Sequence, residues 1–142
     1  MIAKEYLKQA YRLDQRINAR IKEKSEIYQL ACSVSATTFE EKIHSGTKNN
    51  EAKFVKRLEK CYLLEAEIDA EIDMFVDLKR QMREVVQELE SIDEQLVLMK
   101  RYLLGNSWEK IAEELHADIR TVYRWHTKAL KNLKLPEHPI EI

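Results

Sequence analysis

The chain has 142 residues, with 24 Lys or Arg and 25 Asp or Glu, so that its formal net charge is −1. Gly and Pro occur only twice each, although average usage would place roughly 10 glycines in a chain of this length. This shortage excludes folds built from sheets and tight turns, and it predicts an all-α protein made of a few long helices.

The two cysteines, Cys32 and Cys61, form no CxxC pair and lie on helical patterns. We therefore expect no disulfide scaffold, no zinc ribbon and no cofactor, and a reducing cytosol as the compartment. No apolar run approaches the roughly 18 residues that span a bilayer, and the N-terminus lacks the apolar segment of a signal peptide. The sequence therefore predicts a soluble, cytoplasmic protein without a membrane partner.

The first part of the chain carries one apolar stripe with helical spacing. It predicts a long amphipathic helix from about residue 2 to residue 34. Arg20 and Lys24 interrupt the strict heptad, while Ile21 and Tyr28 lie beside it, so we expect the stripe to drift around a straight helix. The stripe consists of Tyr6, Ala10, Leu13, Ile17, Ile21, Ile27, Ala31 and Val34.

The middle of the chain predicts a loop and a second long helix. Residues 35–50 collect Ser, Thr, Asn and one glycine, which favour turns. Residues 54–89 have eleven positions alternately four and three apart, and a helix of roughly 54 Å needs a partner to bury such a stripe. We expect a long antiparallel coiled-coil hairpin over residues 1–90, although pairing between chains would satisfy the same pattern. The positions are Phe54, Leu58, Cys61, Glu65, Ile68, Ile72, Phe75, Lys79, Met82, Val86 and Leu89.

Residues 91–135 predict a small domain of three short helices, followed by a tail over residues 136–142. Ser91, with Glu94 three residues later, is a capping-box signature. Ser107 and Asp118 are the expected N-caps of the second and third helices. Turns this short between helices fit a helix-turn-helix module. The expected inward positions are Leu96, Met99, Leu103, Ile111, Ala112, Leu115, Val122, Trp125, Ala129, Leu130 and Leu133.

The last predicted helix carries the candidate binding residues. Residues 117–134 hold five basic side chains against one acidic one. In a helix-turn-helix the second helix of the pair enters the major groove of DNA, where exposed residues of its first turns contact base edges. Ser107 and Lys110 open the preceding helix, whose N-terminal amides are expected to hold the DNA backbone. We expect base contacts from Arg120, Thr121, Tyr123 and Arg124, and phosphate contacts from Lys128 and Lys131.

The stretch NSWEKIAEELHADIRTVYRWHTKALKNL resembles the helix-turn-helix of sigma-factor region four, with departures at Asp118 and Trp125. Together with LKQAYRLDQRINARI, EIDAEIDMFVDLKRQM and RYLLGNSWEKIA, nearly the whole chain resembles the ArpU/RinA-like late-transcription regulators of phages and prophages of Gram-positive bacteria. The resemblance implies a sequence-specific DNA-binding transcription regulator without enzymatic activity, in the cytoplasm of a bacterial host. Double-stranded DNA is the implied partner. In this hypothesis the long helices serve a homodimer or contact RNA polymerase.

Two alternatives stay open. The coiled coil could be the active part of a structural or interaction protein that binds no DNA. Glu65, Asp69, Asp73 and Asp77 lie four apart, and such carboxylates could hold Mg²⁺ as in all-helical nucleotide hydrolases. Because most of them point away from the buried stripe, we expect no metal site and favour an acidic face that is solvated or folds against the basic first helix.

Overall fold

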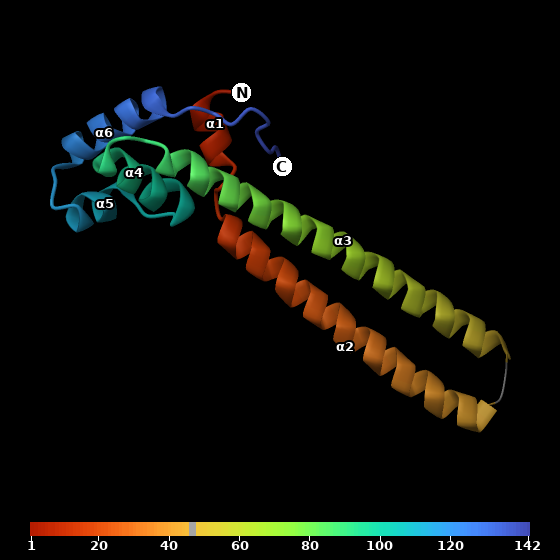
Figure 1. The fold of residues 1–142 in the computed structure, drawn as a ribbon. Helices are drawn as coiled ribbons and strands as arrows, with labels where there is room; N and C mark the ends of the chain where they lie inside the picture. The colour runs from red at the N-terminus through yellow and green to blue at the C-terminus, as the bar shows by residue number, and fades with distance from the viewer. Residues whose placement is uncertain (46–47) are drawn as a thin grey trace. The chain divides into compact units, whose positions relative to one another are not determined.

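The computed structural model describes the backbone of residues 1–45 and 48–142 and the side chains of residues 1–33 and 51–142. Its described elements are all helical, which confirms the all-α class (Figure 1). None of these helices is long and apolar enough to cross a membrane. In chain order they are α1 (Ala3–Lys8), α2 (Leu13–Ser45), α3 (Lys48–Gln87), α4 (Ile92–Leu98), the π-helical turn η1 (Met99–Leu103), α5 (Trp108–Glu114) and α6 (Ile119–Asn132).

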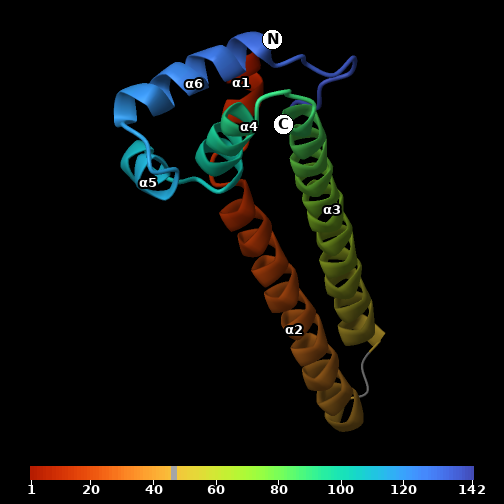
Figure 2. The same ribbon diagram turned by 60° about the vertical axis from the view of Figure 1, so that its left-hand side comes forward.

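The chain divides into two compact units, and the first comprises Gln15–Asp73. In this unit α2 and α3 lie side by side and antiparallel (Figures 1 and 2). Two ion pairs join the helices, from Arg20 Nε to Glu71 Oε2 at 2.9 Å and from Lys24 Nζ to Asp69 Oδ1 at 2.7 Å. The helices therefore pair within one chain, as an antiparallel hairpin.

The stripe predicted on α3 is confirmed along its whole length. Each of its eleven positions, from Phe54 to Leu89, is fully or partly buried. The set includes the two polar members, Glu65 and Lys79, which are partly buried. Because the stripe alternates four and three residues apart, α3 keeps one face buried from Phe54 to Val86, over about nine turns, and Leu89 follows just after the helix end.

The stripe predicted on α2 is wrong in its middle. Ile21 is 51% exposed, whereas Arg20 and Lys24 are partly buried. The buried line therefore keeps the heptad spacing and does not drift, because the two cations take stripe positions and pair with carboxylates of α3. The line consists of Leu13, Ile17, Arg20, Lys24, Ile27 and Ala31. The side chain of Val34 lies outside the described residues.

The expected loop over residues 35–50 is also wrong. Helix α2 continues to Ser45 and α3 begins at Lys48, so residues 35–45 and 48–50 are helical. Residues 46 and 47 lie outside the described residues. Most residue types differ by less than about 0.7 kcal/mol in helix propensity. A run of Ser, Thr and Asn without proline therefore does not stop two helices that continue from longer segments.

The second unit comprises Met1–Asp14 and Met74–Ile142, and it begins with a break that the sequence did not predict. Instead of one helix from residue 2 to residue 34, α1 ends at Lys8 and Arg12 adopts a positive φ of 52°. No glycine or proline marks this position. The break accompanies the complete burial of Tyr6 and Leu7, and the Tyr6 hydroxyl donates to Gln81 Oε1 at 2.8 Å.

Helices α4, α5 and α6 of this unit pack around a small apolar core (Figure 2). Its buried centre is formed by Val97, Ile111, Ala112 and Val122. The buried face of α4 differs from the predicted one. Val97 and Leu98 are fully buried, whereas the predicted positions Leu96, Met99 and Leu103 are only partly buried. Because α4 packs against α6, and its Val97 also joins the core with Ile111 and Ala112 of α5, it buries adjacent positions and not one stripe.

Candidate nucleic-acid interface

The turn between α5 and α6 is short and well defined. His116 has a positive φ of 52° directly after the helix end. Its amide donates to the Glu113 carbonyl at 3.2 Å, and the Ala117 amide donates to the Ala112 carbonyl at 3.0 Å. This pair of bonds forms a Schellman motif, with His116 where glycine is usual. Asp118 occupies the N-cap position of α6, but its side chain makes no capping hydrogen bond, contrary to the prediction.

One side of α6 forms a continuous basic face. We use this name for the exposed residues Arg120, Tyr123, Arg124, Thr127, Lys128 and Lys131. Their spacing of three and four residues keeps them on one line of the helix, over about 16 Å. The four cations lie at intervals of about one turn, and residues 119–135 contain no acidic side chain. The basic face therefore offers four positive charges to one ligand.

Most of the predicted contact residues lie together on this face, including Arg120, Tyr123, Arg124, Lys128 and Lys131. Thr121 does not, because it is partly buried beside the face. Thr127 replaces it as the exposed threonine, and its hydroxyl donates to the Tyr123 carbonyl at 3.0 Å. Among the residues that the structure describes, no carboxylate pairs with any of the four cations.

The start of α5 lies beside the N-terminal half of the basic face. The ring of Trp108 meets the ring of Tyr123 edge-on, with centroids 5.2 Å apart. Ser107 caps α5, because its hydroxyl accepts from the Lys110 amide at 3.2 Å. The Lys110 side chain is 59% exposed, and its ammonium lies 4.0 Å from the Glu114 carboxylate, which Lys100 already binds at 2.6 Å. Lys110 is therefore available to a ligand at the edge of the basic face.

Arg101, in the turn η1, is a candidate contact residue that the sequence analysis missed. Its guanidinium lies over the Trp108 ring, 4.5 Å from the centroid, and Nη1 donates to the Asn106 carbonyl at 3.1 Å. These contacts fix a further cation near the start of α5. No local signal could have found it, because its position depends on the π-helical turn and on packing against α5.

His126 lies beside the basic face but does not belong to it. The ring is partly buried, 2.8 Å from the Tyr102 hydroxyl through Nε2, and it meets Trp108 edge-on at 4.7 Å. Burial lowers the pKa of His126 to about 4, and the positive charges of Lys4 and Arg101 add to this effect. The imidazole is therefore neutral at pH 7, and it supports α6 without adding charge.

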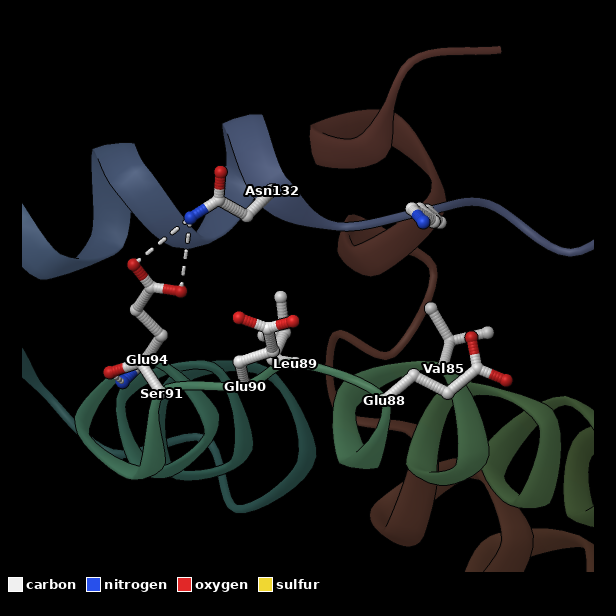
Figure 3. Close-up of a pocket in the computed structure, with 8 residues that line it drawn as sticks. Val85, Glu88, Leu89, Glu90, Ser91, Glu94 and Asn132 are labelled. Atoms are coloured by element: carbon white, nitrogen blue, oxygen red, sulfur yellow. Dashed lines mark hydrogen bonds between the residues drawn. The ribbon is translucent and has the colours of Figure 1, made fainter.

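A groove on another side of this unit has the opposite character (Figure 3). It lies where α3 ends, α4 begins and α6 ends, and has a volume of about 410 Å³. Three carboxylates line it, from Glu88, Glu90 and Glu94, against the single cation Lys134, and Asn132 reaches across it to Glu94. An acidic groove repels phosphate, so the basic face is the better candidate for a nucleic-acid interface.

The acidic residues of α3 form no cluster of metal ligands. Asp69 and Glu71 are bound by Lys24 and Arg20 of α2, which is one of the two arrangements left open for this acidic face. In the described part of the chain, no group of three or more His, Cys, Asp or Glu side chains is placed to hold a metal ion.

Comparison with known proteins gives one match. The model of a family described as a protein of unknown function (DUF722) matches residues 11–134. No curated protein and no solved structure matches the chain significantly.

Proposed function

Because the chain belongs to the DUF722 family, whose function is not known, its activity has to be inferred from its own surface, and we propose that it is a sequence-specific DNA-binding transcription regulator. The observation that carries the proposal is the basic face of α6. Four cations without acidic partners lie on the second helix of a helix-turn-helix pair, which is the element that enters the major groove in this motif.

The proposed division of roles follows the position of each side chain on α6. Arg120 and Arg124, in the first two turns, contact base edges, where a guanidinium can make two hydrogen bonds to guanine. Lys128 and Lys131, further along, neutralise phosphates. Ser107, Lys110 and Arg101, near the start of α5, hold the neighbouring DNA backbone. The resemblance to sigma region four and to phage late-transcription regulators supports the same proposal and makes late phage genes the proposed targets.

The experiment is a selection from a random DNA library with the full chain at fixed salt, followed by affinity measurements over a salt series. We expect one enriched sequence motif and a logarithmic affinity that falls linearly with the logarithm of salt concentration. The double variant Arg120→Ala/Arg124→Ala should lose preference for the motif, at about 1–3 kcal/mol for each lost bidentate contact. Both side chains are exposed, so the fold should persist.

The matched control removes two exposed cations from α3, as Arg57→Ala/Lys60→Ala. It changes the net charge by the same amount and should leave the selected motif and its affinity unchanged. Equal losses from both double variants would show that binding is only general charge attraction. An absence of binding at low salt would refute the proposal and favour the interaction protein without DNA binding. The nucleotide-hydrolase alternative has its own test: Mg²⁺-dependent turnover that disappears in Asp69→Ala and Asp73→Ala.

A further inference from the structure

The hairpin unit Gln15–Asp73 exposes more large apolar side chains than it buries. Among its described residues, only the apolar side chains of Ala31 and Ile68 are buried. Large apolar residues are 40% or more exposed at seven positions: Ile21, Tyr28, Leu30, Val55, Tyr62, Leu63 and Leu64. Two helices cannot enclose a core by themselves, and contiguous exposed apolar surface is typical of an interaction site.

Four of these residues lie on one side of the hairpin, which we call the apolar flank. Ile21 and Tyr28 each follow a stripe position of α2, and Val55 and Tyr62 each follow a stripe position of α3. In an antiparallel pair of helices, the positions that follow the stripe come together on the same side. Seven residues separate the members of each pair, so the apolar flank extends over about 20 Å.

Tyr28 and Tyr62 lie near the middle of the apolar flank. The ion pairs Arg20–Glu71 and Lys24–Asp69 set the register of the two antiparallel helices, which places Tyr28 and Tyr62 at neighbouring levels of the hairpin. Their side chains are 62% and 58% exposed. The opposite flank carries four charged residues, Arg16, Glu23, Arg57 and Glu71, besides Leu30 and Leu64, whereas Asp69 is the one charged residue on the described part of the apolar flank.

The charges of the two helices indicate what covers the apolar flank. Residues 15–33 of α2 carry four basic and two acidic side chains, whereas residues 51–73 of α3 carry four basic and seven acidic ones. A two-fold axis parallel to the hairpin would place α2 of one copy against α3 of the other. Opposite net charges then meet at both new contacts, and every neighbouring pair of helices is antiparallel, as in a four-helix bundle.

We propose that the apolar flank is a homodimer interface, at which two copies of this chain join their hairpins into a four-helix bundle. In this dimer Tyr28 of each copy packs against Tyr62 of the other. The interface forms without DNA, so it stands or falls separately from the proposed DNA-binding function. A two-fold dimer would present two helix-turn-helix modules, so a DNA regulator built this way would select a palindromic site.

Sedimentation of the full chain over a concentration series tests the dimer. We expect a species of twice 16.9 kDa, and we expect Tyr28→Glu/Tyr62→Glu to weaken dimerisation roughly tenfold or more, with unchanged helical content. The matched control is Leu30→Glu/Leu64→Glu, which places the same charges on the opposite flank and should leave the dimer intact. A monomeric wild type, or a control that dissociates as much as the tyrosine variant, would overturn the proposal.

Disulfide cross-linking tests the arrangement even if the glutamate variant fails to fold. Chains with Tyr28→Cys and chains with Tyr62→Cys, both in a Cys32→Ser/Cys61→Ala background, are mixed and oxidised. The proposed dimer predicts cross-linked heterodimers in high yield. Replacing the second chain by Leu63→Cys, on the same helix but off the apolar flank, should lower the yield strongly. Equal yields from the two mixtures would contradict the interface.

Discussion

The side-chain amide of Asn132 donates to both carboxylate oxygens of Glu94, at 3.2 and 3.3 Å. Glu94 belongs to the first turn of α4 and is the only charged residue that is buried among the described side chains. Asn132 is the last residue of α6. This contact therefore joins the end of the proposed DNA-reading helix to the start of the first helix of its module.

Asn132→Ala should destabilise the protein by about 1–3 kcal/mol, because it leaves a buried carboxylate without its partner. The loss cannot come from helix propensity, since alanine is the better helix former. Urea denaturation followed by circular dichroism measures the change. Lys131→Ala, the exposed neighbour, is the control and should change stability little; similar values for both variants would contradict a structural role of the Asn132–Glu94 contact.

His126 should make the protein sensitive to mild acid. Its folded-state pKa of about 4 lies below the ordinary value of 6.5, so the unfolded chain binds the proton first as the pH falls. The contribution of His126 to the free energy of unfolding is complete above pH 6.5 and decreases toward pH 4. The decrease is smaller than the roughly 3 kcal/mol of a fully shielded ring, because the ring of His126 is only partly buried. We expect His126→Gln to remove this part of the decrease, as measured by urea denaturation between pH 4 and 7.5. Parallel curves for the two proteins would exclude His126 as the cause.

Tyr6 should make the protein lose stability as the pH rises into the alkaline range. Burial raises the pKa of Tyr6 to about 12, and the charge of Glu84 adds to the shift. The unfolded chain loses its phenolic proton first, so the contribution of Tyr6 is complete below pH 10 and is lost between pH 10 and 12. Tyr6→Phe should cost about 1 kcal/mol at pH 7, through the lost bond to Gln81, but should lack this alkaline decrease. Denaturation of both proteins between pH 8 and 11 measures the difference.

Two glutamine side chains bind the backbone of the C-terminal residues. Gln81 donates to the His138 carbonyl and accepts from the Ile140 amide, each at 3.0 Å. Gln9 donates to the Ile140 carbonyl at 3.0 Å and accepts from the Ile142 amide at 2.9 Å. In hydrogen-exchange NMR, Gln81→Ala should accelerate exchange of the Ile140 amide roughly tenfold, the effect of about 1.4 kcal/mol.

The reciprocal variant Gln9→Ala provides the control for this prediction. It should accelerate exchange of the Ile142 amide and leave the amide of Ile140 protected by Gln81. If each variant accelerated both amides equally, the two glutamines would act as one unit and not as separate supports.

The sequence by itself determined the helical class, the buried stripe of α3 and most of the basic face of α6. These features depend on the spacing of residue types along one helix. Burial follows that spacing wherever the helix packs along a single face. Even Glu65 and Lys79 were placed correctly on the stripe of α3, because their spacing outweighs their polarity.

Two features could be known only from the tertiary structure, because contacts between distant residues outweigh local preference in both: the stripe of α2 and the break before that helix. Arg20 and Lys24 belong to the stripe of α2 because Glu71 and Asp69 lie opposite them, and neither carboxylate can be identified from α2 alone. The break before α2 accompanies the burial of Tyr6, whose hydrogen-bond partner Gln81 is 75 residues away. Propensities of a few tenths of a kcal/mol per residue cannot encode such contacts, since they depend on which distant residues lie opposite, and burial of a packed side chain contributes more at each site.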